Sequence, residues 1–190
     1  MTLLIIFVCA AILLAAIAIL FVHISNGLIV RRNRVKQCRS SLCVVLKQRN
    51  DLIPNLIASA KTYMGHENEV LTRIAELRSK AFKSDDNEQI AEGNKMTEML
   101  KKFQVSVEQY PKLKADAHFQ HLQEQMVDME DEIQAMRRTY NAAVNDYNNH
   151  VEVFPHSIVA SMKHHTQEQL IEIPQEELQS INAQKLFDAS

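Results

Sequence analysis

Twenty consecutive apolar residues, Leu3 to Val22, lie close to the N-terminus of this chain. At about 1.5 Å per residue, a helix of that length spans about 30 Å, the thickness of the hydrocarbon core of a bilayer. A cleaved signal peptide needs a positively charged start, a shorter apolar core and a small-residue cleavage site. Only Met1 and Thr2 precede the run, and Cys9 lacks the small residues before it that lipoprotein processing requires. We therefore expect an uncleaved transmembrane anchor over residues 1–24.

The charges that follow this run predict its orientation. Between residues 23 and 50 there is no acidic side chain, but there are seven basic ones, which are Arg31, Arg32, Arg34, Lys36, Arg39, Lys47 and Arg49. Basic residues near a membrane helix stay on the cytoplasmic side. We expect a bacterial inner-membrane protein with its short N-terminus outside and the rest in the cytoplasm. Residues 51–190 hold 14 basic and 23 acidic side chains, which argues against nucleic acid as a partner.

Composition and periodicity predict an all-α fold. Three Gly, four Pro and no Trp supply few of the tight turns that a many-stranded fold needs, and three Cys form no disulfide framework. Apolar side chains recur at steps of three and four along residues 115–151, at Phe119, Leu122, Met126, Met129, Ile133, Met136, Tyr140, Ala143 and Tyr147. This spacing is typical of a helix that packs along one face.

Three further helices are expected before this one. The first continues from the membrane run, with a heptad pattern typical of a coiled coil at Leu28, Val35, Cys38, Leu42, Val45, Leu52 and Leu56. Pro54 predicts a kink or break near residues 50–53, and Gly65 a C-terminal cap. The other helices are expected over residues 66–82 and 85–109, the latter capped by side chains of residues 84–87 and followed by a break at Pro111.

Four such helices predict an antiparallel four-helix bundle over residues 25–160, after the transmembrane helix. A short helical turn is expected at residues 157–162. The remainder of residues 161–190 is a polar, acidic tail for which the sequence predicts no structure.

The sequence lacks the usual signatures of catalysis and metal binding. It has no P-loop, no G-x-G-x-x-G, no G-x-S-x-G and no Glu-x-x-His. His118 and His121 share a helix face, but no acidic or thiol ligand is fixed beside them, so an exposed pair is favoured over a metal site. We predict no catalytic residue, no metal and no cofactor.

Several clusters of polar residues stand out because buried charges need partners. We expect Arg49, Asp51, Glu108 and one of Arg137 or Arg138 to form a network that fixes the register of the helices. No nucleophile is paired with a base in these clusters, so a structural role is favoured over catalysis.

The same segments resemble the LemA family. The resemblance rests on RNDLIPNL at 49–56, EQYPKLKA at 108–115, Phe119-x-x-Leu122-Gln123 and RRTYNAAV at 137–144, followed by Tyr147-Asn148 and Phe154-Pro155. It covers about residues 25–160 and does not extend beyond residue 166. It implies a membrane-anchored antiparallel four-helix bundle and no established catalysis. The motif residues singled out are Asn50, Pro54, Asn55, Tyr110, Pro111, Tyr140, Asn141, Tyr147 and Asn148.

Three classes of function follow, in order of preference. The first is a structural, scaffold or adaptor role at the membrane, with a membrane protein as a further partner. The second is a module that binds or senses a peptide or small molecule between its helices, for which a pocket lined by Tyr140, Tyr147 and Glu108 would speak. The third is an enzyme, which a metal bound at His118 and His121 would support.

Self-association is a further expectation. The heptad residues Leu28, Val35 and Leu42 lie directly after the membrane run, and alanines within the run permit close approach of neighbouring helices. The competing interpretation is that these three side chains pack against the last helix of the same chain.

Overall fold

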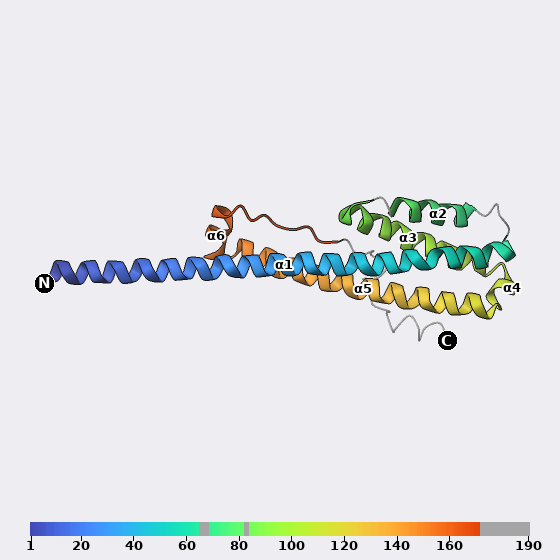
Figure 1. Cartoon of the computed structure of the whole chain (residues 1–190), viewed down its shortest axis with the longest axis horizontal. Helices are drawn as coiled ribbons and strands as arrows, with labels where there is room; N and C mark the ends of the chain where they lie inside the picture. Colours follow the sequence, from blue (N-terminus) through green and yellow to red (C-terminus); the bar gives the residue numbers. More distant parts are fainter. Residues whose placement is uncertain (65–68, 82–83, 172–190) are drawn as a thin grey trace, which may run out of the picture. The chain divides into compact units, whose positions relative to one another are not determined.

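The computed structural model describes residues 1–64, 69–81 and 84–171 of the 190-residue chain. This part of the chain is helical and holds no strand, so the all-α prediction is confirmed there. Residues 1–31 with 140–171 form one compact unit, and residues 32–139 form another. The helices are α1 (Thr2–Met64), α2 (Glu69–Ala81), α3 (Asp86–Val107), α4 (Pro111–Lys114), α5 (Ala117–Glu152) and α6 (His156–Met162) (Figure 1).

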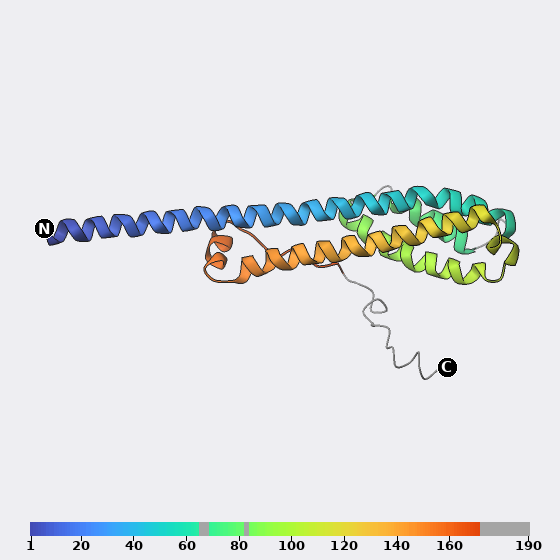
Figure 2. The same cartoon turned by 90° about the horizontal axis from the view of Figure 1, so that it is seen from below.

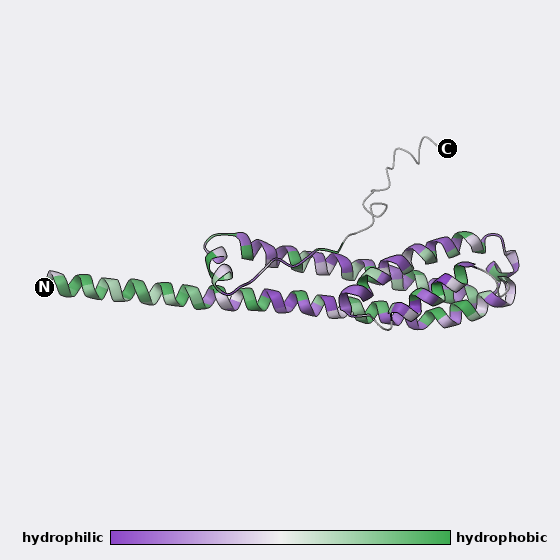
Figure 3. Ribbon diagram, turned by 90° about the horizontal axis from the view of Figure 1, so that it is seen from above, coloured by the Kyte–Doolittle hydropathy of each residue, from purple (hydrophilic) through white to green (hydrophobic). Residues whose placement is uncertain are grey.

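Helix α1 begins with the apolar run. Every side chain from residue 1 to residue 20 is exposed, and the green stretch of α1 in Figure 3 shows how uniformly apolar this segment is. Among the described residues, α1 is the one helix long and apolar enough to span a bilayer. Burial starts just after the run, at Ile24, Ser25 and Leu28.

The break predicted near Pro54 is absent, because α1 continues through Pro54 to Met64. A proline has no N–H to donate to the carbonyl four residues earlier, here that of Asn50. Arg78 of α2 compensates, since its Nε donates to the Asn50 carbonyl at 3.1 Å. Pro54 therefore leaves the Asn50 carbonyl without a donor within α1, and Arg78 of α2 supplies one. The predicted cap at Gly65 lies outside the described residues.

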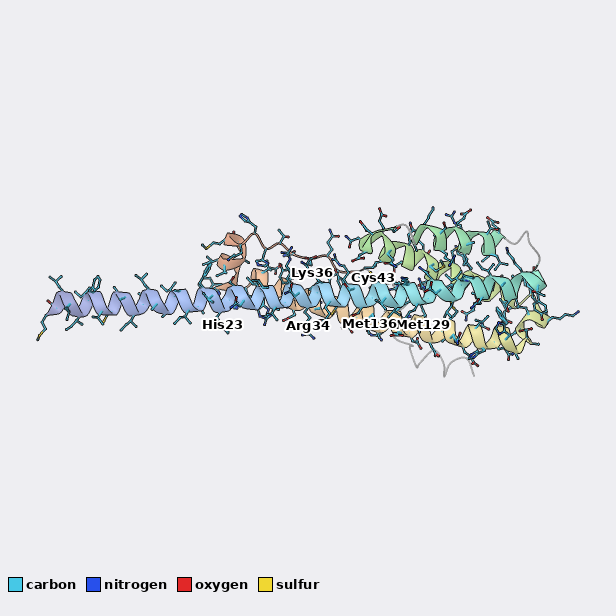
Figure 4. All side chains as sticks on the ribbon, in the orientation of Figure 1. His23, Arg34, Lys36, Cys43, Met129 and Met136 are labelled. Carbon is cyan, nitrogen blue, oxygen red and sulfur yellow. The ribbon has the colours of Figure 1, made fainter. Side chains whose placement is uncertain are left out.

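The unit formed by residues 32–139 has one apolar core, to which five helices contribute. Leu56, Phe119, Leu122 and Met126 come from the predicted apolar patterns, and Phe103 packs edge-on against Phe119 with ring centroids 6.1 Å apart. Met129 and Met136 of α5, labelled in Figure 4, are half-buried. The buried core residues are Ile53, Leu56, Ala60, Met64, Leu71, Ile74, Leu77, Met96, Phe103, Val107, Leu113, Phe119, Leu122 and Met126.

Helix ends in this unit follow from local chemistry. The Asp85 side chain accepts from the amides of Asn87 and Glu88, which confirms the predicted cap of α3. Pro111 is the first residue of α4, where its missing N–H costs nothing. Asp116 precedes α5 and accepts from the Phe119 amide and the Tyr63 hydroxyl, and both bonds hold the pKa of that carboxyl below its usual value.

In the unit formed by residues 1–31 and 140–171, α6 lies beside the part of α1 that follows the apolar run (Figures 1 and 2). Val159 and Ala160 are buried on α6. Arg31 of α1 pairs with Asp146 of α5 at 3.3 Å. The start of the expected tail, up to Ile171, is not free: hydrogen bonds hold it to α5. Residues 172–190 lie outside the described part.

The residues assigned to self-association require a correction. Leu28, Val35 and Leu42 are 1%, 1% and 0% exposed within the single chain. Their side chains are not available to a second copy of the folded protein. Self-association itself stays a prediction.

The pairing of Pro54 with Arg78 predicts a non-additive effect on stability. Replacing Arg78→Met should lower the free energy of unfolding by about 1.5 kcal/mol, because it leaves a carbonyl without its charged donor. In a Pro54→Ala background the new amide satisfies that carbonyl, so the same replacement should cost clearly less. Denaturant unfolding followed by circular dichroism measures both, with Lys80→Met on the exposed side of α2 as the control. Equal costs in the two backgrounds would refute this role for Pro54.

Candidate functional site

The most deeply buried charge of the 32–139 unit is Arg49, which is 0% exposed on α1. Its Nη1 donates to Thr97 Oγ1 of α3 at 2.8 Å and to Glu130 Oε2 of α5 at 2.9 Å. Its Nη2 donates to the Gly93 carbonyl of α3 at 2.9 Å. One guanidinium therefore joins three helices through three charge-assisted bonds.

Burial and ion pairing have opposite effects on the pKa of Arg49. Removal from water lowers the pKa of Arg49, and the neighbouring Glu130 carboxylate opposes that effect. The group nevertheless stays charged, since arginine does not deprotonate in proteins. Gly93 matters here because a Cβ at that position would lie 2.8 Å from Leu46 Cδ2. The absence of a side chain lets α3 approach α1 closely enough for its carbonyl to accept from Arg49.

A second arginine, Arg137 of α5, is 2% exposed. Its Nη2 donates to Asn94 Oδ1 of α3 at 2.7 Å. Arg137 is also close enough to lower the pKa of Arg49 by repulsion. The two buried cations are thus held by side chains of α3 and by one carboxylate.

The structure corrects the predicted network in two of its members, Asp51 and Glu108. Both are exposed, and Glu108 pairs with Lys114 at 2.7 Å instead of with a buried arginine. Of the two arginines given as alternatives, Arg137 is buried and Arg138 is exposed. The partners that Arg49 uses lie outside the motifs that drew attention to it. One signal for Glu130 was present, because it precedes Arg137 by seven residues and so lies on the same helix face.

The remaining motif residues before α5 have separate places. Asn50 is buried, and its carbonyl accepts from Arg78. Pro54 and Asn55 are exposed on α1. Tyr110 is half-buried and precedes Pro111 at the start of α4. Asn50, Pro54 and Asn55 thus lie within α1, whereas Tyr110 and Pro111 lie at the start of α4.

The motif residues of α5 do form a common site, with residues 165–171. Tyr147 Oη lies 2.9 Å from His165 Nδ1, and the Tyr140 hydroxyl donates to the Gln169 carbonyl at 3.0 Å. Asn141 and Asn148 bind the main chain of the same segment. We call Tyr140, Asn141, Tyr147 and Asn148 the clamp residues. Sequence reasoning named all four but missed what they bind, because the segment itself has no recognisable pattern.

A groove opens beside the Arg49 cluster between α1, α3 and α5, with a volume of about 180 Å³. Its floor is apolar, from Leu56, Phe103 and Met126, and Thr97 and Glu130 lie at its side. The pocket anticipated from Tyr140, Tyr147 and Glu108 is not this one: the two tyrosines are buried with their hydroxyls engaged, and Glu108 is on the surface.

The predicted histidine pair offers little for a metal. His118 and His121 are exposed, and the nearest acidic group of His121 is Glu124 at 3.9 Å. Within residues 1–64, 69–81 and 84–171, no three His, Cys, Asp or Glu side chains are grouped to hold an ion.

The Arg49 cluster predicts unequal effects of one chemical change at two neighbouring sites. Glu130→Gln should lower the free energy of unfolding by about 1.5–3 kcal/mol, since it leaves the buried guanidinium without its counter-charge. Glu132→Gln, on the exposed side of the same helix, should change it by less than about 0.5 kcal/mol. Denaturant titration of both variants measures the difference. Similar values for the two would mean that the ion pair does not stabilise the fold.

Comparison with known proteins places this arrangement in a family. A model of the LemA family matches residues 39–184, which extends beyond residue 166, where the sequence resemblance was expected to end. The chain is also 28% identical over 144 residues to the protein LemA of Metamycoplasma hominis, covering 74% of this chain and 66% of that relative's length. The matched region includes both the Arg49 cluster and the clamp residues with the segment that they hold. The chain belongs to the LemA family.

Proposed function

We propose that this protein is a single-pass, membrane-anchored scaffold or adaptor of the bacterial inner membrane. The observation that carries the proposal is the course of α1. This helix exposes every side chain from Thr2 to Leu20 and continues without a break to Met64, where its side chains belong to a packed core. A helix that is apolar on all sides suits lipid, and the same helix deeper in the chain suits protein.

The orientation proposed is a short N-terminus outside and the helical part in the cytoplasm. The seven basic residues between positions 23 and 50 support it, since such residues resist transfer across the membrane. Arg34 and Lys36 are exposed on α1 (Figure 4), where they can meet anionic lipid head groups.

The surroundings of α6 also suit a place at the membrane surface. Lys163 Nζ lies 6.0 Å from the centre of the Phe21 ring, at the end of the apolar run. Phe154, Ile158 and Met162 expose 75%, 55% and 65% of their surface at and near α6. Apolar side chains beside a basic one are typical of segments that rest on a bilayer.

A structural role is supported by how the interior uses its polar groups. We propose that α1, α2, α3 and α5 of the 32–139 unit make an antiparallel four-helix bundle, because short connections join helices that share one core. Arg49, Thr97 and Arg137 bind groups on neighbouring helices, and the Glu130 carboxylate that accepts from Thr97 Oγ1 at 3.1 Å is also paired with Arg49. Such bonds fix helices and leave the outer faces for partners.

A second candidate function is the binding of a small molecule or peptide between the helices. The groove of about 180 Å³ beside Glu130 favours it, since an apolar floor with a carboxylate at its edge suits an apolar ligand that carries a donor. We also propose self-association. Because the heptad residues Leu28, Val35 and Leu42 are buried within the chain, the contact between copies is assigned to the membrane-spanning part of α1.

The adaptor role predicts position-specific contacts in cells. A photo-crosslinking residue at Val105 or Val127, which are 72% and 47% exposed on α3 and α5, should give discrete adducts with another membrane protein. The same residue at Leu113, which is 0% exposed, should give none. Protease added outside the cells should leave the adducts intact, because both positions are expected in the cytoplasm.

Three outcomes bear on this proposal differently. Adducts with a different protein support the adaptor role, and adducts of twice the chain mass support self-association in its place. The absence of adducts at both exposed positions would refute a protein-binding role, and cleavage from outside would refute the orientation.

A further inference from the structure

Residues 165–171 are bound to α5 in an unusual way. The segment is neither helix nor strand, and asparagine side chains of α5 hold its main chain. Asn148 donates from Nδ2 to the Glu168 carbonyl at 2.9 Å and accepts from the Glu168 amide at 2.9 Å. Asn141 does the same with Ile171, donating to its carbonyl and accepting from its amide, both at 2.9 Å. Each asparagine therefore satisfies both main-chain groups of one residue.

The spacing of the two asparagines matches an extended chain. Asn141 and Asn148 are seven residues apart, which is two helical turns and about 10.5 Å along α5. Glu168 and Ile171 are three residues apart, which is about 10 Å in an extended chain. The distance between the two asparagines along α5 therefore matches the distance between Glu168 and Ile171 along the segment, which runs antiparallel to α5. A side chain of the wrong length, or a spacing of six or eight, would not bring both amides into register.

These contacts recognise the polypeptide main chain and not particular side chains. The Tyr140 hydroxyl adds a further bond to a main-chain carbonyl, that of Gln169. Tyr147 contacts a side chain of the segment, that of His165. The side chains of Gln167, Gln169 and Leu170 are exposed, and Gln167 reaches Glu152 near the end of α5.

The hold on the segment rests on hydrogen bonds at a surface. Leu170 leaves 51% of its surface exposed, and Ile171 is half-buried. Bonds of this kind are replaced by water when the segment leaves, which makes local opening easier than opening of the helices. A second extended chain with two free amides three residues apart could then take its place.

We propose that the clamp residues form a binding site for an extended polypeptide of a partner protein, and that residues 165–171 are its resident, exchangeable occupant. The site reads main-chain amides at two positions three residues apart, tolerates varied side chains, and excludes proline at those two positions. This inference goes beyond the scaffold role, and it does not depend on the membrane anchor.

The test uses the full-length protein in detergent and a fluorescent peptide with the sequence of residues 164–171. In the variant Glu168→Pro with Ile171→Pro, the resident segment loses both amides that the asparagines bind. The peptide should bind this variant at least about tenfold more tightly than the wild-type chain, because the competitor is weakened. Circular dichroism and thermal unfolding report whether the variant keeps its helices.

Matched substitutions on α5 identify the site. Adding Asn141→Ala with Asn148→Ala to the proline variant should remove the gain in affinity. Adding Asn145→Ala with Asn149→Ala, two exposed asparagines of the same helix, should leave it unchanged. A peptide with altered side chains at the positions of 167, 169 and 170 should bind within about threefold, whereas N-methylation at the positions of 168 and 171 should prevent binding.

Hydrogen exchange keeps the proposal testable without the proline variant. In the wild-type chain the amides of Glu168 and Ile171 should be protected, and Asn141→Ala with Asn148→Ala should remove that protection while the α5 amides keep theirs. The proposal is overturned if a folded proline variant binds the peptide no better than the wild type. It is equally overturned if N-methylation leaves the affinity of the peptide unchanged. The same holds if replacing Asn145 and Asn149 lowers that affinity as much as replacing Asn141 and Asn148.

Discussion

The buried guanidinium of Arg49 is the interaction on which the packing of residues 32–139 depends. A guanidinium at 0% exposure is stable only where several hydrogen-bond acceptors meet it, and those of Arg49 come from α3 and α5. Apolar side chains alone do not fix the register between packed helices. A shift by one helical turn replaces one apolar side chain in a contact by another of similar size, which costs little free energy. The fixed geometry of three hydrogen bonds does not allow this. The ion pair therefore contributes register more than net stability.

The same principle recurs wherever the chain uses a polar side chain to bind main-chain atoms. Arg49 binds the Gly93 carbonyl, Arg78 binds the Asn50 carbonyl that Pro54 leaves free, and Asn141 binds both groups of Ile171. Main-chain groups are present in every residue, so these contacts constrain the position of a segment and leave its sequence open.

The sequence predicted the helices better than the contacts between them. The cap of α3 at Asp85 could be predicted because capping is local, and the seam of α5 because periodicity is local. The course of α1 through Pro54 could not, since the compensating donor, Arg78, is 28 residues away from Asn50. Glu130 and Thr97 were missed for the same reason. A buried arginine indicates that hydrogen-bond partners are needed, but the sequence does not indicate which helix supplies them. The segment bound by Asn141 and Asn148 has no local signal, because its contacts are made by its main chain.

A fixed register matters for the adaptor role that we propose, because it would keep the arrangement of the faces offered to a partner. The most direct test is native-state hydrogen exchange of the full-length protein with and without Thr97→Val, which removes a hydroxyl that accepts from Arg49. We predict that the slowest amides near Arg49 on α1, near Thr97 on α3 and near Glu130 on α5 open with one common free energy, which the substitution lowers equally on all three helices. Separate opening free energies for the three helices, or a loss of protection confined to α3, would contradict the account.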